Sequence, residues 1–187
     1  MRPPAAAIDA IAEALQVARE RTLSLIADVA HDDLHRPLDP IMSPLVWDLG
    51  HIAAYEDLWC AHRLAGEPLL RPERMSLYDA FETPRAARAE VELLGRDDAL
   101  EYLDAVRERT LAVLERRGPS ELHEMTLRHE LVHTETMRQA MFLGALGGGH
   151  PRHQPTFPRE PQAVTIPAGP FEMGAGERGF AYDNERP

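Results

Sequence analysis

Apolar side chains recur every three or four residues through the first 147 residues of the chain, which is the spacing of one helix face. The first series predicts a helix over about residues 5–30 and comprises Ile8, Ile11, Leu15, Leu25 and Val29, with Thr22 on the same face. A second helix is expected over about 43–64, because Ser43 is a natural N-cap residue and Pro44 a natural first helical residue.

Two further helices are expected before the apolar periodicity ends. The third, over about 97–117, opens on two aspartates and stops at a Gly-Pro pair. The fourth, over about 120–146, begins near Ser120 and stops at a run of three glycines. Four helices of 20 or more residues indicate an all-α four-helix bundle. The connection over about 66–96 is long for plain up-and-down topology, and loops of that length are usually functional or contain short elements of their own.

The composition of the chain changes near residue 147. Residues 148–162 form a segment rich in proline and glycine, which predicts a linker rather than a helix. Residues 163–167 (AVTIP) are a short β-like run, followed by turns at Gly169 and Gly174. Because residues 163–187 are too few to bury a core of their own, we expect them to be the opening of an incomplete second domain that follows a bundle over 1–147.

Charge and cysteine content narrow the class of protein. The chain has 20 Lys and Arg against 31 Asp and Glu, a net charge of −11, which argues against nucleic-acid binding and against docking on an anionic membrane. The one cysteine, Cys60, excludes an internal disulfide and makes a reducing, cytoplasmic setting the default expectation. The sequence has neither an apolar run of the roughly 18–20 residues that span a bilayer nor the apolar region of a signal peptide.

Three of the nine histidines have the arrangement of metal ligands. His129 and His133 are four residues apart on one predicted helix, so their rings project from one face, one turn apart. His51 lies within the second predicted helix, with Trp47 and Tyr55 one turn away on either side. Inward-facing histidines from two helices of a bundle can converge on one metal, although imidazole alone does not choose among Zn, Fe, Cu and Ni. The other six are expected at the surface or in loops: His31, His35, His62, His123, His150 and His153.

Two other interpretations of these histidines remain. His129 to His133 also matches HExxH, the pattern in which two histidines bind zinc and glutamate acts as a general base in metalloproteases. The extended metalloprotease signature requires glycine and histidine where this chain has Thr136 and Gln139, and no predicted sheet precedes the helix, so this interpretation is disfavoured. In the other, the chain is a non-catalytic bundle that binds a partner, with its histidines buried for packing.

Several segments together resemble one enzyme family, the sulfoxide synthases of ergothioneine biosynthesis (the EgtB family). Residues 129–137 (HELVHTETM) fit that family's HxxxHxE pattern, with Glu135 as its acid. The other segments that carry the resemblance are 42–52 (MSPLVWDLGHI), 78–81 (YDAF) and 84–88 (PRAAR). Residues 164–174 and 182–187 resemble the start of a formylglycine-generating-enzyme-like (sulfatase-modifying-factor) domain, which in this family follows a DinB-like four-helix bundle.

The resemblance implies an activity and a set of site residues. His51, His129 and His133 would hold a mononuclear non-haem Fe(II), and the enzyme would use O2 to join hercynine to a thiol, γ-glutamylcysteine or cysteine, as a sulfoxide. Arg85 and Arg88 match positions that bind the carboxylates of the thiol substrate in the family, a use that suits the guanidinium fork. The family's active-site tyrosine belongs to the second domain, so the resemblance identifies no catalytic residue in this chain, and we expect the chain alone to bind metal but to make little or no sulfoxide.

Two positions depart from the family's pattern. Val132 stands where members have a glutamine near the imidazole substrate, and Val91 where some have a tyrosine, which leaves the thiol donor and the polar contacts to hercynine open. The alternative function is that of a DinB-like metal-dependent low-molecular-weight-thiol transferase, because that superfamily uses the same three-histidine site. The tail at 163–187 favours the two-domain sulfoxide synthase over the thiol transferase.

Overall fold

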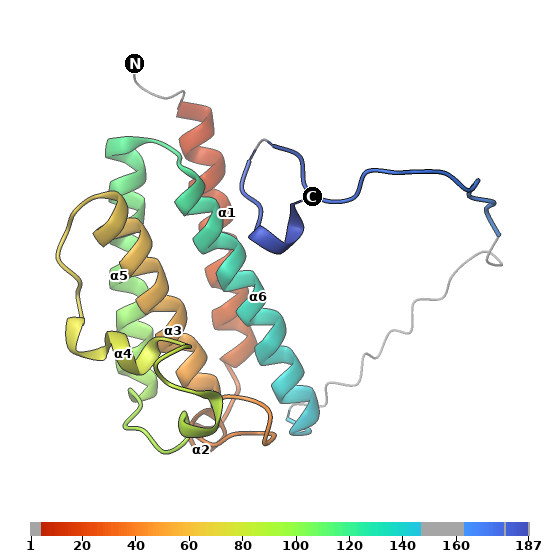
Figure 1. Ribbon diagram of the computed structural model, residues 1–187. Coiled ribbons are helices and arrows are strands. Elements are labelled where there is room, and N and C mark those ends of the chain that lie inside the picture. Colours follow the sequence, from red (N-terminus) through yellow and green to blue (C-terminus); the bar gives the residue numbers. More distant parts are fainter. Residues whose placement is uncertain (1–4, 147–162, 178, 187) are drawn as a thin grey trace.

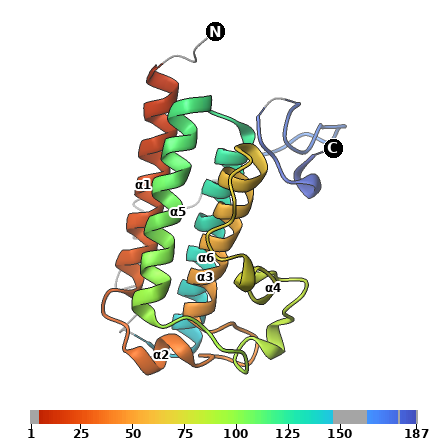
Figure 2. The same cartoon turned by 90° about the vertical axis from the view of Figure 1, so that its left-hand side faces the viewer.

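A computed structural model describes residues 5–146, 163–177 and 179–186, and confirms an all-α bundle (Figure 1). Four long helical segments pack side by side: α1 (Ala5–Ile26), α3 (Leu45–Glu56) with its continuation η1 (Asp57–Leu64), α5 (Arg96–Arg117) and α6 (Glu121–Leu143). A five-residue helix, α2 (His31–His35), closes the lower end of the bundle in both views (Figure 2). Among the described residues there is no strand.

The direction of the helices explains the long connection in the middle of the chain. Helix α3 runs parallel to α5 and antiparallel to α6, so the chain must return along the bundle between α3 and α5 (Figure 1). Three short elements lie in that connection: η2 (Pro72–Arg74), α4 (Met75–Tyr78) and η3 (Arg85–Ala87). The expectation that a loop of this length contains short elements is therefore confirmed.

The predicted helix boundaries hold at most ends and fail at three. The first helix ends at Ile26 rather than near residue 30. Beyond that end, the Arg96 side chain donates hydrogen bonds to the carbonyl oxygens of Ile26, Ala27 and Val29, in place of the backbone amides of a further helical turn. The second begins at Leu45, because Ser43 is not its N-cap; its hydroxyl instead accepts a hydrogen bond from Arg88 at 2.9 Å. The fourth ends at Leu143, three residues before the expected end.

The second long helix changes its hydrogen-bonding pattern halfway along. Residues Asp57–Leu64 form a π-helix that continues α3 without a break. Within it, the buried Asp57 accepts hydrogen bonds from the Leu70 amide at 2.8 Å and from Arg109 at 2.7 Å. These contacts tie the start of the returning connection to α5.

The bundle interior combines an apolar core with a cluster of four buried charges. The core centres on α3, with Trp47, Leu49 and Ile52 almost completely buried. The buried charge cluster consists of one side chain from each long helix: Arg19, Glu56, Arg107 and Glu130. Each arginine pairs with both glutamates at 2.7–3.0 Å, so the cluster carries no net charge and links all four helices.

The C-terminal residues that the structure describes form no strand. Residues 163–167 are exposed and belong to no helix or strand, so the β-like run has no regular structure here; a strand requires a neighbouring strand to pair its backbone groups. Farther on, a small loop is closed by a hydrogen bond from the Ala175 amide to the Glu185 carbonyl oxygen and contains η4 (Asp183–Glu185). The predicted linker at 148–162 lies outside the described residues. None of the helices in the described residues combines the length and the apolar character of a membrane span.

Candidate metal centre

The structure brings the three predicted ligands together across two antiparallel helices. His51 extends from α3 toward α6, which presents His129 and His133 on one face. One nitrogen from each ring can be chosen so that the three nitrogen atoms lie within 4.8 Å of one another, an arrangement that could hold a single metal ion. Among the described residues this is the one such group of three side chains.

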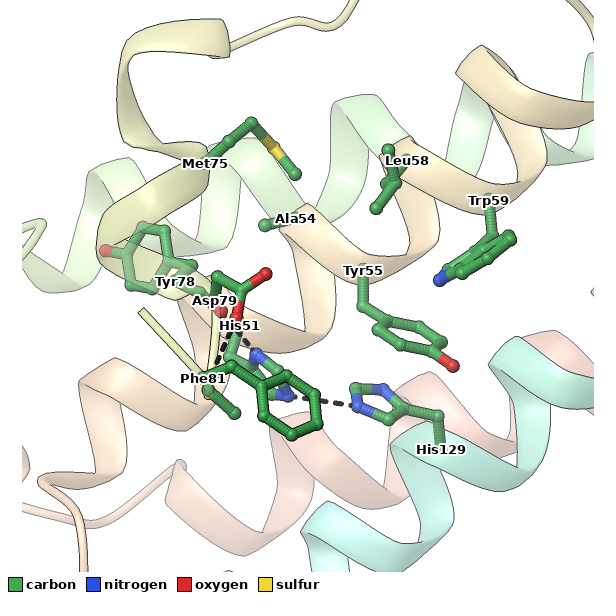
Figure 3. Close-up of a pocket in the computed structure, with 11 residues that line it drawn as sticks. His51, Ala54, Tyr55, Leu58, Trp59, Met75, Tyr78, Asp79, Phe81 and His129 are labelled. Atoms are coloured by element: carbon green, nitrogen blue, oxygen red, sulfur yellow. Dashed lines mark hydrogen bonds between the residues drawn. The ribbon is translucent and has the colours of Figure 1, made fainter. Parts of the chain in front are cut away.

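His51 is oriented by the connection that returns alongside α3. Its Nδ1–H donates to the carbonyl oxygen of Tyr78 at 2.6 Å. Because a carbonyl oxygen only accepts, this hydrogen bond places the ring proton on Nδ1 and leaves Nε2 with a free lone pair. That Nε2 lies 3.0 Å from Nε2 of His129 (Figure 3).

His133 is oriented by a carboxylate. Its Nδ1–H donates to Oδ1 of Asp48 at 2.9 Å, and Asp48 itself is buried on α3. A carboxylate behind a metal-binding histidine fixes the ring and makes the other nitrogen a stronger donor. The packing of α3 against α6 selects Asp48 for this role.

His129 is held by ring stacking. Its imidazole lies 3.7 Å from the ring centroid of Tyr55 and is inclined to it by 11°. Figure 3 shows the Tyr55 side chain extending from α3 over His129. The residue that follows His129 along the chain, Glu130, points away from the three histidines into the buried charge cluster, where it links α6 to α1 and α5.

The environment keeps two of these imidazoles neutral, as metal ligands must be. Burial, together with the proximity of His133, lowers the pKa of His51 to about 4. Burial and the two neighbouring imidazoles lower the pKa of His129 to about 2. Each neutral imidazole has one nitrogen with a free lone pair, and a metal ion can bind that lone pair without first displacing a proton.

A cavity of about 320 Å³ opens directly against His51 and His129. Its walls are mostly apolar and aromatic, with Tyr55, Trp59 and Phe81 around His129 and with Asp79 beside His51 (Figure 3). Phe81 is 96 % exposed and stands at the mouth of this cavity. A largely apolar pocket with a few polar groups at one end is the usual form of a small-molecule site.

The two predicted substrate-binding arginines lie in the α3–α5 connection, outside the described lining of the cavity. Arg85 is exposed and donates to the carbonyl oxygen of Ile41 at 2.7 Å. Arg88 is buried, and its guanidinium carbon lies 3.6 Å from the centroid of the Trp47 ring. The structure thus places them close in the fold but gives them different surroundings.

One expectation about the remaining histidines is wrong. His123 is completely buried rather than at the surface, and its Nδ1 accepts a hydrogen bond from the Ser120 amide at 3.2 Å, which helps to cap α6. His31 and His62 are exposed as expected, and His35 is partly buried. His150 and His153 lie outside the described residues.

The chemistry of the donor set fits a divalent transition metal. Three imidazoles supply borderline nitrogen ligands and no negative charge. Two of the rings have their second nitrogen engaged by an oxygen acceptor, as is usual for metal-binding histidines. These three side chains could therefore hold a metal ion with the neighbouring cavity open to a further ligand.

The bundle and its histidine site define the class of protein. The family model of the DinB superfamily matches residues 14–154, and the chain belongs to this superfamily.

Within this superfamily, the chain is similar to curated proteins that are named hercynine oxygenases, which confirms the resemblance seen in the motifs. The chain is 39% identical to a hercynine oxygenase of Mycolicibacterium smegmatis over 198 aligned positions, which cover 96% of this chain and 44% of the relative. It is 39% identical to a hercynine oxygenase of Mycolicibacterium thermoresistibile, over 95% of the chain and 42% of the relative. A hercynine oxygenase of Mycobacterium tuberculosis is 44% identical over 67% of the chain and 31% of the relative. The chain therefore spans less than half the length of these relatives.

Proposed function

We propose that this chain is the metal-binding part of a non-haem iron(II)-dependent sulfoxide synthase that joins hercynine to a thiol, γ-glutamylcysteine or cysteine. The observation that carries the proposal is the convergence of His51, His129 and His133 beside an open cavity, in a chain whose relatives are named hercynine oxygenases. The reaction balances with O2 as oxidant: a ring C–H and the S–H are lost, a C–S bond forms, one oxygen atom goes to sulfur and the other leaves as water.

In this proposal the protein supplies binding, orientation and electrostatics, and bound Fe(II) supplies the activation of O2 and of the thiol. The three histidines would hold the ion as neutral ligands. Tyr78 and Asp48 accept the Nδ1 protons of His51 and His133, which leaves the opposite nitrogen of each ring available to a metal. The cavity against His51 and His129 is the proposed place for an organic substrate, because a mostly apolar pocket with a few polar groups at one end suits a small molecule.

Arg85 and Arg88 are the proposed binding residues for the carboxylates of the thiol substrate. Guanidinium groups pair with carboxylates through two parallel hydrogen bonds, which fixes both position and orientation. The exposed guanidinium of Arg85 is accessible to such a ligand. The remainder of the second domain, in the same chain or as a separate chain, would complete the site.

Metal content tests the central part of this proposal. The chain is loaded with Fe(II) without oxygen and desalted, and bound iron is measured for the native protein and for His51→Ala, His133→Ala and the exposed control His31→Ala. We expect about one iron per native and control chain and loss of iron in both ligand variants. Iron retention that is unaffected by His51→Ala would overturn the two-helix site, and tight zinc in place of iron would favour the thiol-transferase function.

Product formation tests the proposed reaction and the need for the rest of the second domain. The loaded chain is mixed with hercynine and γ-glutamylcysteine in air, and sulfoxide is sought by mass spectrometry. We expect little or no product from this chain alone and product once the rest of the enzyme is supplied. Abundant sulfoxide from this chain alone would refute the need for a second domain.

A further inference from the structure

Arg88 is held in place by protein groups alone, whether or not it also binds a ligand. It is 6 % exposed. Its Nε donates to the Thr83 carbonyl oxygen at 3.1 Å, Nη1 to the Ser43 hydroxyl at 2.9 Å, and Nη2 to the Ala80 carbonyl oxygen at 3.4 Å. Every nitrogen of the guanidinium therefore already has a protein acceptor, which fixes the plane of the group before any substrate arrives.

That fixed guanidinium lies on the indole of Trp47. The distance from its central carbon to the ring centroid is 3.6 Å, within the range of a cation–π contact, and both side chains are buried, where such contacts are strongest. Trp47 is also held by a hydrogen bond from its Nε1 to the Leu77 carbonyl oxygen at 3.1 Å. The indole is thus fixed by its face and by its edge.

Trp47 in turn stacks on the first metal ligand. Its ring and that of His51 are 4.8 Å apart between centroids and inclined by only 14°. They are one helical turn apart on α3, and their hydrogen bonds go to successive carbonyl oxygens, those of Leu77 and Tyr78. Any shift of the indole would move the surface against which the imidazole rests.

We propose that Arg88 is a positioning residue for the metal centre, which acts through Trp47 to fix the ring of His51. This inference rests on the proposed function for the metal itself, but it gives Arg88 a role that needs no thiol substrate. Arg88, Trp47 and His51 form a continuous stack, and a single side chain thereby joins the returning connection to the ligand on α3. If Arg88 also binds a substrate carboxylate, as proposed above, the same stack would couple thiol binding to the orientation of His51.

Metal affinity in the absence of thiol separates this role from substrate binding. Co(II) is titrated anaerobically into the native chain, Arg88→Met and Arg88→Lys, with the visible absorption of the bound ion as readout. Lysine keeps the charge but lacks the planar group, so both variants are expected to lose about 10-fold in affinity, the lower end of the effect of outer partners on metal sites. Arg74→Met is the matched control, because Arg74 lies in the same connection and donates to the Glu92 carbonyl oxygen at 2.7 Å; we expect its affinity within twofold of native.

A double-variant cycle tests the route through the indole. In a Trp47→Leu background the change Arg88→Met should have no further effect on Co(II) affinity, since the contact through which it acts is already absent. An equal loss in both backgrounds would overturn the proposal. An unchanged Co(II) affinity in Arg88→Met would also overturn the proposal. If that variant only melts at a lower temperature, Arg88 has a merely structural role. If it only binds γ-glutamylcysteine more weakly, Arg88 has a substrate-binding role.

The outcomes also distinguish this inference from the proposed function. Absence of Co(II) binding by the native chain would remove the three-histidine centre and this inference together. Native binding that the Arg88 variants leave unchanged would overturn this inference alone and leave the metal centre standing.

Discussion

Replacement of Arg107 by methionine would remove one cation from the buried charge cluster and leave its surroundings otherwise intact. Arg107 donates to Glu56 from Nε at 2.8 Å and from Nη2 at 2.9 Å, to Glu130 from Nη2 at 2.7 Å, and to the Leu15 carbonyl oxygen. Methionine is shorter, but it is unbranched, flexible and uncharged, so it would fill the part of the space that the arginine stem occupies. The two glutamates would then share Arg19 as their one remaining partner in the cluster.

The expected cost follows from burial. The four charged groups of the cluster have side chains only 1–5% exposed, so water cannot replace a missing partner. Removal of one member of such a cluster leaves an uncompensated buried charge, at a cost of about 3–5 kcal/mol. The pKa of Glu56 shows how strongly the carboxylate depends on its partners: burial raises it, yet Arg107 and Arg19 outweigh burial and bring it down to about 2.

Urea unfolding followed by circular dichroism would measure the change in the free energy of unfolding. Arg128→Met is the matched control, because Arg128 makes an ion pair with Glu124 at 2.6 Å between side chains that are 44% and 33% exposed. Exposed pairs of this spacing contribute only about 0.3–0.5 kcal/mol. The control should therefore be nearly as stable as the native chain.

A second substitution tests whether the unpaired charge is the cause. In the Arg107→Met background, Glu56→Gln removes the surplus negative charge and leaves Arg19 paired with Glu130 at 2.8 Å. We expect this double variant to regain at least about 1 kcal/mol over the single variant. A loss below about 1 kcal/mol in Arg107→Met, or no recovery in the double variant, would refute the electrostatic reasoning.

Three further predictions concern the site and its surroundings. The folded-state pKa values of His51 and His129, about 4 and about 2, lie below the ordinary value of 6.5, so the unfolded chain binds more protons than the folded chain below pH 6.5. The metal-free protein should therefore lose stability as pH falls from 6.5 toward 4.5, at up to roughly 1.4 kcal/mol per pH unit per histidine. The variant His51→Gln should show a smaller slope of melting temperature against pH. Gly50→Ala would place a methyl group against the ring of Tyr78, whose carbonyl holds His51, so urea unfolding should show a loss of about 1–3 kcal/mol, and an unaltered stability would contradict this packing. Burial, aided by a nearby carboxylate, raises the pKa of the Cys60 thiol to about 12, so Ellman's reagent should react slowly with the native chain and fully after denaturation, whereas rapid native reaction would show the thiol to be accessible.

The helices of the bundle could be predicted closely from the sequence because helical spacing is local. The third predicted helix differs from α5 by one residue at its start, and Ser120 caps α6 through a hydrogen bond from the Leu122 amide at 3.2 Å. Helix ends were less predictable where a distant residue intervenes. Arg96 ends α1 from 70 positions away along the chain, and Arg88 takes the hydroxyl of Ser43 that would otherwise cap α3.

The same division applies to the candidate site. That His129 and His133 share a helix face follows from their spacing, and the motifs indicated His51 as the third ligand. Charged side chains on the helices gave no sign of burial, because Arg19 and Arg107 are ordinary surface residues by type. They can be buried because the packing of the bundle places Glu56 of α3 and Glu130 of α6 against them as charged partners.

The sequence by itself determined the helices, the acidic charge and the histidine pair, since these depend on residue type and on spacing within a few turns. The tertiary structure decided which carboxylate stands behind His133, which carbonyl accepts from His51, and that Arg88 stacks on Trp47. The first depends on the antiparallel packing of α3 against α6. The other two depend on the parallel course of α3 and α5 and on the connection that returns between them. The direction of these helices cannot be predicted from local sequence, because it depends on how the apolar faces and the buried charges of helices distant in sequence pack together.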